Sequence, residues 1–273
     1  MKKTVIGAIA LLGALAVNPV SAKETISAVG SSSVTPLMEV FSETYMKKNS
    51  DVFIEVQGPG SSAGIKAAKN GSADIGMSSR NLKDSEKESN LVEEVIARDG
   101  IAVVVNPSNK VKGLSAEQVS AIYKGEVSNW KEVGGEDKPI VAITRDTASG
   151  TRGAFEEIME LKMKVSGKTV SAISQRAQVA NGNGGLKTMV ASNPYAIGYI
   201  SLGTVDNSVH ALAIDGVNAS VENVKSGSYK VARPFLVLYK KGQPSAETQK
   251  FLDWMLTDEA QEIVGSHHYI SVK

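Results

Sequence analysis

The 273-residue sequence contains no cysteine, only three histidines, 5% aromatic residues and no marked excess of either charge. The absence of cysteine excludes disulfides, thiolate metal sites and a lipid anchor attached through cysteine. A formal net charge of +1 argues against a nucleic-acid partner, because such recognition shows as a clear basic excess or stripe. Clusters of His, Asp and Glu at metal-binding spacing are missing, and we expect the protein to work without a metal or another cofactor.

Apolar runs of membrane-spanning length are missing as well. Two lysines precede an apolar run over residues 5–17, and residues 20–22 supply a cleavage site, which is the pattern of a secretory signal peptide. The run is too short for a spanning helix, which needs roughly 20 apolar residues. We therefore expect residues 1–22 to be removed and the mature chain to be a soluble periplasmic monomer that does not insert into the membrane. Loss of the two lysines leaves 28 basic against 29 acidic residues, a formal charge of −1.

Apolar, β-branched stretches alternate with segments of helical period, which predicts an α/β protein with parallel strands and covering helices. The predicted strands lie at residues 25–29, 52–56, 73–77, 100–107, 139–144, 195–203 and 233–241. The predicted helices lie at residues 37–45, 65–69, 115–125, after 151, and at 246–258 and 259–266. A long loop is predicted at residues 162–172.

The strands at 100–107 and 233–241 are predicted to cross between two lobes. The chain would enter the second lobe through the first of these strands and return through the other, so that the C-terminal helices belong to the first lobe. This organisation divides the mature chain into lobe I, residues 23–104 and 238–273, and lobe II, residues 105–237.

Three junctions run from an extended segment through Gly, Ser and Thr residues into a helix, at residues 30–34, 60–64 and 149–152. Each junction can direct unpaired backbone N–H groups and hydroxyl donors at a point beyond the helix N-terminus, where the helix dipole also favours an anion. Any one junction can equally be a plain N-cap. Three of them in one chain favour a shared anion-binding site.

Arginines flank the third junction. Arg145 directly follows the predicted strand at 139–144, and Arg152 falls in the first turn of the next helix, where a cation opposes the helix dipole. A bound anion would relieve this conflict, since a guanidinium fork can hold two oxygens of a tetrahedral anion. The alternative for both arginines is surface solvation with an ion pair to Asp146. Arg80 is a further candidate of the same kind.

Residues 60–64 also match the G-x-S-x-G pattern of a serine hydrolase, with Ser62 as the nucleophile. That chemistry needs a histidine base, and His210, His267 and His268 are all predicted to have surface roles. No second feature supports acyl transfer. We therefore expect a binding protein rather than an enzyme, with the hydrolase as a remote alternative.

The ordered motifs together resemble those of the periplasmic phosphate-binding proteins that feed the ABC-type phosphate uptake system. The matching stretches, in family order over residues 24–273, are GSSSVTPLMEVFSETY, GPGSSAGIKA, ADIGMSSRNL, RDTASGTRGAFEE and NPYAIGYISLG. The resemblance implies a two-lobed class II periplasmic binding protein fold in which two hinge-crossing strands join the lobes around phosphate. It also implies a high-affinity receptor that delivers inorganic phosphate to the membrane permease of an ABC transporter.

Position by position, the resemblance implies a set of phosphate-binding residues: Ser32, Ser33, Ser61, Ser79, Arg145, Ser149, Gly150 and Thr151. Some family members have a carboxylate at the position of Ser79, which accepts the proton of hydrogen phosphate and repels sulfate. A serine hydroxyl can also accept a hydrogen bond. Asp146 is another candidate acceptor, unless it orients Arg145. The alternative ligand is therefore another tetrahedral oxyanion, sulfate or molybdate.

Overall fold

The computed structural model describes residues 23–273, and the predicted signal peptide at 1–22 lies outside the described residues. The helices are α1 (Thr35–Lys48), α2 (Ser61–Asn70), α3 (Ala116–Lys124), α4 (Gly150–Ile158), α5 (Gly182–Ala191), α6 (Val221–Lys225), α7 (Ala246–Met255) and α8 (Asp258–Ser266). The strands are β1 (Glu24–Gly30), β2 (Val52–Gln57), β3 (Ile75–Ser78), β4 (Leu91–Val105), β5 (Gly113–Leu114), β6 (Val141–Arg145), β7 (Lys162–Val165), β8 (Lys168–Ser171), β9 (Gln178–Ala180), β10 (Ala196–Ser201), β11 (His210–Ala211), β12 (Ala213–Ile214) and β13 (Ala232–Lys240). None of the helices in residues 23–273 combines the length and apolarity needed to cross a membrane.

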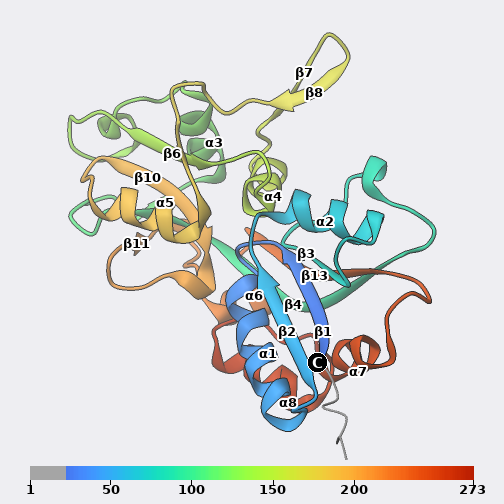
Figure 1. The fold of residues 1–273 in the computed structure, drawn as a ribbon. Coiled ribbons are helices and arrows are strands. Elements are labelled where there is room, and N and C mark those ends of the chain that lie inside the picture. Colours follow the sequence, from blue (N-terminus) through green and yellow to red (C-terminus); the bar gives the residue numbers. More distant parts are fainter. Residues whose placement is uncertain (1–22) are drawn as a thin grey trace, which may run out of the picture.

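One nine-stranded sheet runs through the molecule in the order β2-β1-β3-β13-β4-β10-β6-β9, with β11 beside β4 (Figure 1). The 15-residue strand β4 joins the two halves. Its first part pairs with β13, and its last part, residues 101–105, pairs with β10. Strands β1, β2 and β3 are parallel, as are β10, β6 and β9, whereas β4 and β13 run antiparallel. The predicted two-lobed α/β fold with long crossing strands is confirmed.

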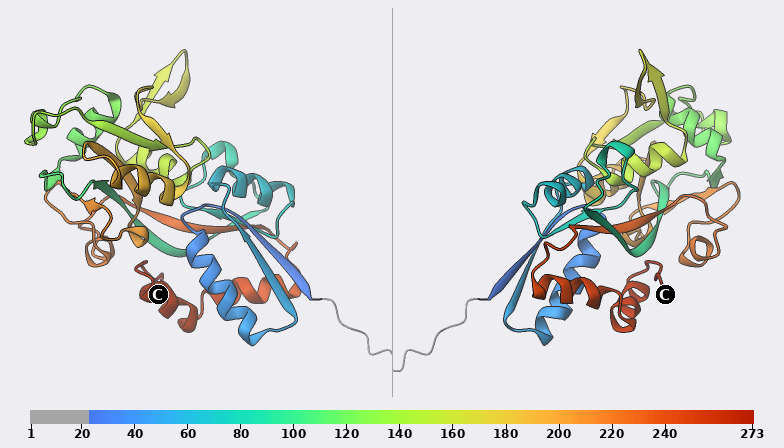
Figure 2. Two further views of the ribbon diagram at one scale, coloured as in Figure 1. Left: turned by 60° about the vertical axis from the view of Figure 1, so that its left-hand side comes forward. Right: turned by 90° about the vertical axis from the view of Figure 1, so that its right-hand side faces the viewer.

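Each half of the sheet has its own apolar core. In lobe I, α1, α7 and α8 pack on the sheet through residues such as Phe41 and Phe251 (Figure 2). In lobe II, α3 and α4 pack on β10, where the ring of Phe155 stacks 3.9 Å from that of Tyr199. Helix α2 covers the other side of the lobe I strands, and α5 covers the other side of β10.

Each crossing strand contributes residues to both cores, to the lobe I core in one part and to the lobe II core in the other. Ile96 and Ala97 of β4 belong to the lobe I core, whereas Ile101 and Val103 belong to the lobe II core. The change on β13 falls between Ala232 and Phe235. The sequence places the boundaries a few residues later on both strands, after 104 and 237.

Helix α3 shows why the predicted elements form where they do. Ser115 Oγ accepts the N–H of Gln118 at 3.1 Å, and the Gln118 side chain accepts the N–H of Ser115 at 2.8 Å. This reciprocal arrangement is a capping box. Gly125 ends the helix with a left-handed φ of 81°.

The prediction of a long loop at residues 162–172 is wrong. Strands β7 and β8 form an antiparallel hairpin in which Met163 lies opposite Val170. Its turn residues Ser166 and Gly167 have φ angles of 49° and 77°, and two successive positive φ angles are typical of a type I′ turn. The hairpin projects from lobe II (Figure 1).

Candidate functional site

The three polar junctions meet between the lobes. Thr151 Oγ1, at the start of α4, lies 2.8 Å from Ser33 Oγ, which precedes α1. The N–H of Ser62, at the start of α2, donates to the carbonyl of Ala148 at 3.1 Å. The contact between lobes is tightest at Gly150, where an added Cβ would lie 2.1 Å from Ser61 Oγ. Helix N-termini from both lobes therefore face one small buried region. We call this region, where Ser33 and Ser61 of one lobe meet Gly150 and Thr151 of the other, the anion cluster.

The junction before α1 is shaped by Ser31, which the sequence analysis did not single out. Ser31 Oγ accepts the N–H groups of Ser33 and Val34 at 3.2 and 3.3 Å. Gly30 precedes it with a φ of 151°, and a Cβ there would lie 2.1 Å from the carbonyl oxygen of Met77. Only glycine allows β3 to approach this closely, and the approach sets the position of the serines that follow.

Arg145 ends β6 and extends its buried guanidinium into the anion cluster. Its Nη1 donates to Asn183 Oδ1 at 2.9 Å, and its Nη2 donates to Ser32 Oγ at 3.0 Å, across the lobes. Its buried Nε has no hydrogen-bond partner among residues 23–273. Burial lowers the pKa of Arg145, and the nearby Asp146 works against that shift. The cluster thus contains a desolvated cation with an unused donor, which an anion would stabilise.

Ser79 lies at the centre of the cluster. It is fully buried, its Oγ lies 2.8 Å from Ser31 Oγ and 3.4 Å from Ser61 Oγ, and its N–H donates to Ser61 Oγ at 3.1 Å. The structure brings together every residue of the phosphate-binding set predicted from the sequence: Ser32, Ser33, Ser61, Ser79, Arg145, Ser149, Gly150 and Thr151.

The remaining candidates are bonded elsewhere. Arg80 forms a two-fold ion pair with Glu86, at 2.7 and 2.8 Å. Burial works against the charge of Glu86, but the bonds from Arg80 and from the Lys83 N–H outweigh it and lower the pKa of Glu86. The charge of Arg80 is therefore balanced by the carboxylate of Glu86.

Arg152 and Asp146 also have local partners. Arg152 donates to Glu156 Oε1 at 2.7 Å and to the carbonyl of Arg145 at 2.8 Å, so its guanidinium supports the backbone behind the cluster. Asp146 Oδ1 accepts the N–H of Ala148 at 2.8 Å, which shapes the turn into α4. Arg145 is oriented by Asn183 and Ser32 instead.

Besides Ser31, sequence reasoning missed two residues of the cluster, Arg233 and Asn183. Arg233 is the second residue of β13, lies directly opposite Asp99 of β4, and is 4% exposed. The signal for Arg233 was a charged residue directly before the apolar run of β13, but that signal does not identify Asp99 as its partner. Asn183 Nδ2 donates to Ser33 Oγ at 3.0 Å from the first turn of α5. That helix begins at Gly182 and is not among the predicted helices, and this omission hid the role of Asn183.

The residues of the hydrolase alternative lie apart from one another. Ser62 Oγ accepts a long bond of 3.4 Å from Arg80 Nη2. Among residues 23–273 no hydrogen bond joins Ser62 to a histidine; His210 lies on β11, and His267 bonds the carbonyl of Ile263. In the same described part of the chain, no group of three or more His, Cys, Asp or Glu is arranged to hold a metal.

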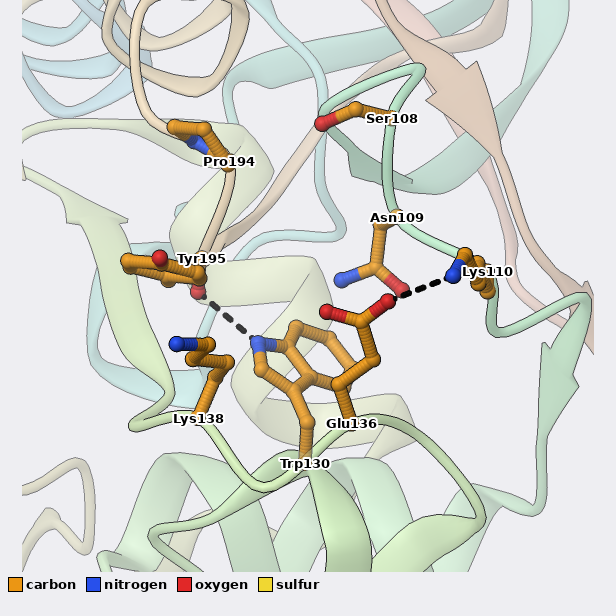
Figure 3. A pocket seen from close by; sticks show the side chains of 8 residues that line it. All are labelled: Ser108, Asn109, Lys110, Trp130, Glu136, Lys138, Pro194 and Tyr195. Carbon is orange, nitrogen blue, oxygen red and sulfur yellow. Dashed lines mark hydrogen bonds and ion pairs between the residues drawn. The ribbon is translucent and has the colours of Figure 1, made fainter.

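Other hollows have polar groups that already bond one another. A cavity of about 210 Å³ in lobe II is lined by Trp130 and Tyr195, with Lys110 paired to Glu136 and the Trp130 Nε1 donating to the Tyr195 carbonyl (Figure 3). A larger hollow, of about 890 Å³, reaches from Ser149 to the β7–β8 hairpin, and it is lined by the Arg80 and Arg152 side chains already described. The anion cluster is therefore the better candidate for function.

Comparison with known proteins points to one family. A family model described as a PBP superfamily domain matches residues 17–259. The phosphate-binding protein PstS of Bacillus subtilis is 32% identical over 255 residues, which cover 92% of this chain and 82% of that protein.

Solved structures agree. A putative phosphate ABC transporter substrate-binding protein from Clostridium perfringens, with bound phosphate, is 45% identical and has a TM-score of 0.86, covering 92% of this chain and 100% of that one. An ABC-type phosphate transport receptor from Vibrio cholerae is 39% identical with a TM-score of 0.77, covering 90% of this chain and 99% of that one.

Proposed function

This chain belongs to the PBP superfamily and, within it, to the PstS-like phosphate-binding proteins, and from that premise we propose that it binds inorganic phosphate in the anion cluster and delivers it to an ABC transporter. The observation that carries the proposal is the convergence of helix N-termini from both lobes on the buried guanidinium of Arg145.

The predicted phosphate-binding residues suit a tetrahedral oxyanion. Backbone N–H groups at the starts of α2 and α4 add helix dipole potential, and serine and threonine hydroxyls supply further donors. Arg145 contributes the charge, and its unpartnered Nε adds a donor in a desolvated site. We propose Ser32, Ser33, Ser61, Ser79, Arg145, Ser149, Gly150 and Thr151 as the ligand-binding residues.

The same contacts couple binding to closure of the lobes. Ser33 with Thr151, and Arg145 with Ser32, already join the lobes across the cluster. A ligand that bonds donors from both sides favours this closed arrangement over an open one and shifts the population toward it. The lobe boundaries after 104 and 237, with their hinge on the crossing strands, are part of this proposal.

The cellular setting follows from the family and the N-terminal sequence. We propose that the chain is exported, loses residues 1–22, and acts in the periplasm as a monomeric receptor without catalytic turnover. Its partners would be inorganic phosphate and the membrane permease, with no role for nucleic acid. Another tetrahedral oxyanion remains the alternative ligand.

Calorimetric titration of the purified mature protein tests the proposal. The protein is unfolded and refolded first to remove carried-over ligand, and phosphate is then added. We expect a dissociation constant near or below about 1 μM, or roughly −8 kcal/mol, as uptake of a scarce nutrient requires. A folded protein that gives no phosphate signal would refute the function.

A further inference from the structure

The neighbours of Ser79 determine whether its hydroxyl donates or accepts a hydrogen bond toward the ligand. A serine hydroxyl offers one donor and two acceptor lone pairs. Ser31 Oγ already accepts two backbone N–H groups, from Ser33 and Val34, so its own hydrogen is directed to Ser79 Oγ at 2.8 Å. One lone pair of Ser79 is therefore occupied.

Arg233 occupies the second lone pair. Its Nε and Nη2 both donate to Asp99 Oδ2, at 3.2 and 2.9 Å, so the fork is fixed against β4. The remaining Nη1 is directed at Ser79 Oγ, at 3.4 Å. Because both acceptor sites of Ser79 are then used, its hydrogen is free to point only at Ser61, 3.4 Å away, or at a ligand.

The charged groups around this point are two arginines and two aspartates. Asp99 forms an ion pair with Arg233 from β4, whereas the Arg145 guanidinium reaches in from β6 with Asp146 beside it and bonds the uncharged side chains of Asn183 and Ser32. Tyr199 and Tyr269 face the arginines, and burial raises the pKa values of both phenols, so both stay neutral. Arg233 itself helps to depress the pKa of Arg145, as expected for two cations that share a desolvated region.

We infer that Arg233 is the second cation of the anion cluster, and that together with Ser31 it holds Ser79 as a hydrogen-bond donor. The inference rests on the proposed phosphate-binding function and specifies its ligand class. The position that could accept a ligand proton instead donates to the ligand. The site therefore takes tetrahedral dianions without requiring a proton on them, so sulfate competes with phosphate and the hydrogen phosphate dianion binds better than the monoanion.

The wild-type protein gives the main test, by calorimetry with phosphate and with sulfate from about pH 6 to about pH 8. A site built around a proton acceptor rejects a ligand that lacks the proton by about 10⁴-fold or more, and we expect a phosphate-to-sulfate affinity ratio well below that. Phosphate affinity should rise with pH through its second ionisation, which lies near neutrality. Sulfate stays a dianion throughout, so its flat profile controls for titration of the protein.

The outcomes separate this inference from the function on which it rests. Tight phosphate binding with a ratio of about 10⁴ or more, or with affinity that falls as pH rises, overturns the inference and leaves the phosphate receptor intact. If neither phosphate nor sulfate binds, both the inference and the proposed function are refuted.

Variants test the roles of the two residues. Arg233→Lys keeps the charge but loses the fork, and it should weaken both anions by about tenfold, the value of one charge-assisted bond. Arg98→Lys is the matched control, since Arg98 is an exposed neighbour of Asp99 on β4. Ser79→Asp introduces an acceptor and should lower the affinity for sulfate far more than the affinity for phosphate. Unchanged affinities in a folded Arg233→Lys protein would refute the role of Arg233. If either variant fails to fold, the titrations of the wild-type protein with phosphate and sulfate still test the inference.

Discussion

Arg145 combines burial, charge and direct contact with both lobes. Replacing it with alanine removes two cross-cluster bonds and the cation that balances a desolvated anion. Bonds to charged groups contribute about 1.5–3 kcal/mol each, so we expect phosphate affinity to fall by at least about a hundredfold. Calorimetry measures the loss, with the exposed Arg176→Ala of the same lobe as control. Near-normal affinity in Arg145→Ala would remove this residue from the site.

Gly150 tests whether the lobes must close. A Cβ at this position would lie 2.1 Å from Ser61 Oγ and 2.6 Å from Ser79 Oγ, both in the opposite lobe. Gly150→Ala should therefore hold the lobes apart and weaken phosphate by about a hundredfold, the loss of two or more hydrogen bonds. The unfolding free energy of the unliganded protein should change by no more than about 0.5 kcal/mol. Gly184→Ala, also in the first turn of a helix, meets nothing within 4 Å and should bind normally.

The proposed ligand residues could be named from the sequence because they combine local rules with family motifs. Serines, threonines and glycines at helix starts have a direct physical reason to bind an anion, and the resemblance indicated which of them to propose. Arg233 was not predictable in this way, because its role depends on its pairing with Asp99 across two strands. Such pairing is a property of the sheet register, which the local sequence does not specify.

Helix α3 provides a test of stability that is separate from binding. Ser115→Ala removes the cap and half of the capping box, so the unfolding free energy should fall by about 1 kcal/mol while phosphate affinity stays unchanged. Urea unfolding measures the first effect and calorimetry the second. Ser115→Asp preserves a good cap and should be close to wild type. A change of affinity in Ser115→Ala would show that α3 influences the site.

The β7–β8 hairpin shows where prediction of elements fails. Residues 162–171 carry three lysines and a Ser-Gly pair, so their polarity favoured a loop. The alternation of Met163, Val165 and Val170 with lysines, on both sides of Ser-Gly, was the overlooked strand signal. All three apolar residues are exposed by 40–51%, so the usual burial that accompanies strands is missing here.

The organisation in two lobes was predictable from the alternation of strands and helices, but the position of the change between cores was not. Residues 101–105 of β4 are apolar and buried without interruption, so the apolar run continues well past the change of cores. A continuous apolar run fits either core equally well, and only the partners in the folded sheet decide which residues belong to which lobe. The predicted boundaries after 104 and 237 fall inside the two apolar runs, where the local sequence carries no sign of a change of strand partners.

Two cores bridged by one ligand imply that phosphate stabilises the whole molecule. Binding to the native state alone adds RT ln(1 + [L]/Kd), or about 4 kcal/mol at a thousandfold excess over Kd. Because the cluster draws donors from both lobes, we expect one cooperative thermal transition that moves upward with phosphate concentration. In Arg145→Ala, the upward shift of the transition temperature at the same phosphate concentration should be smaller, because binding adds less free energy to the native state. A phosphate effect on only one of two separate transitions would mean that a single lobe holds the ligand, and would contradict closure around it.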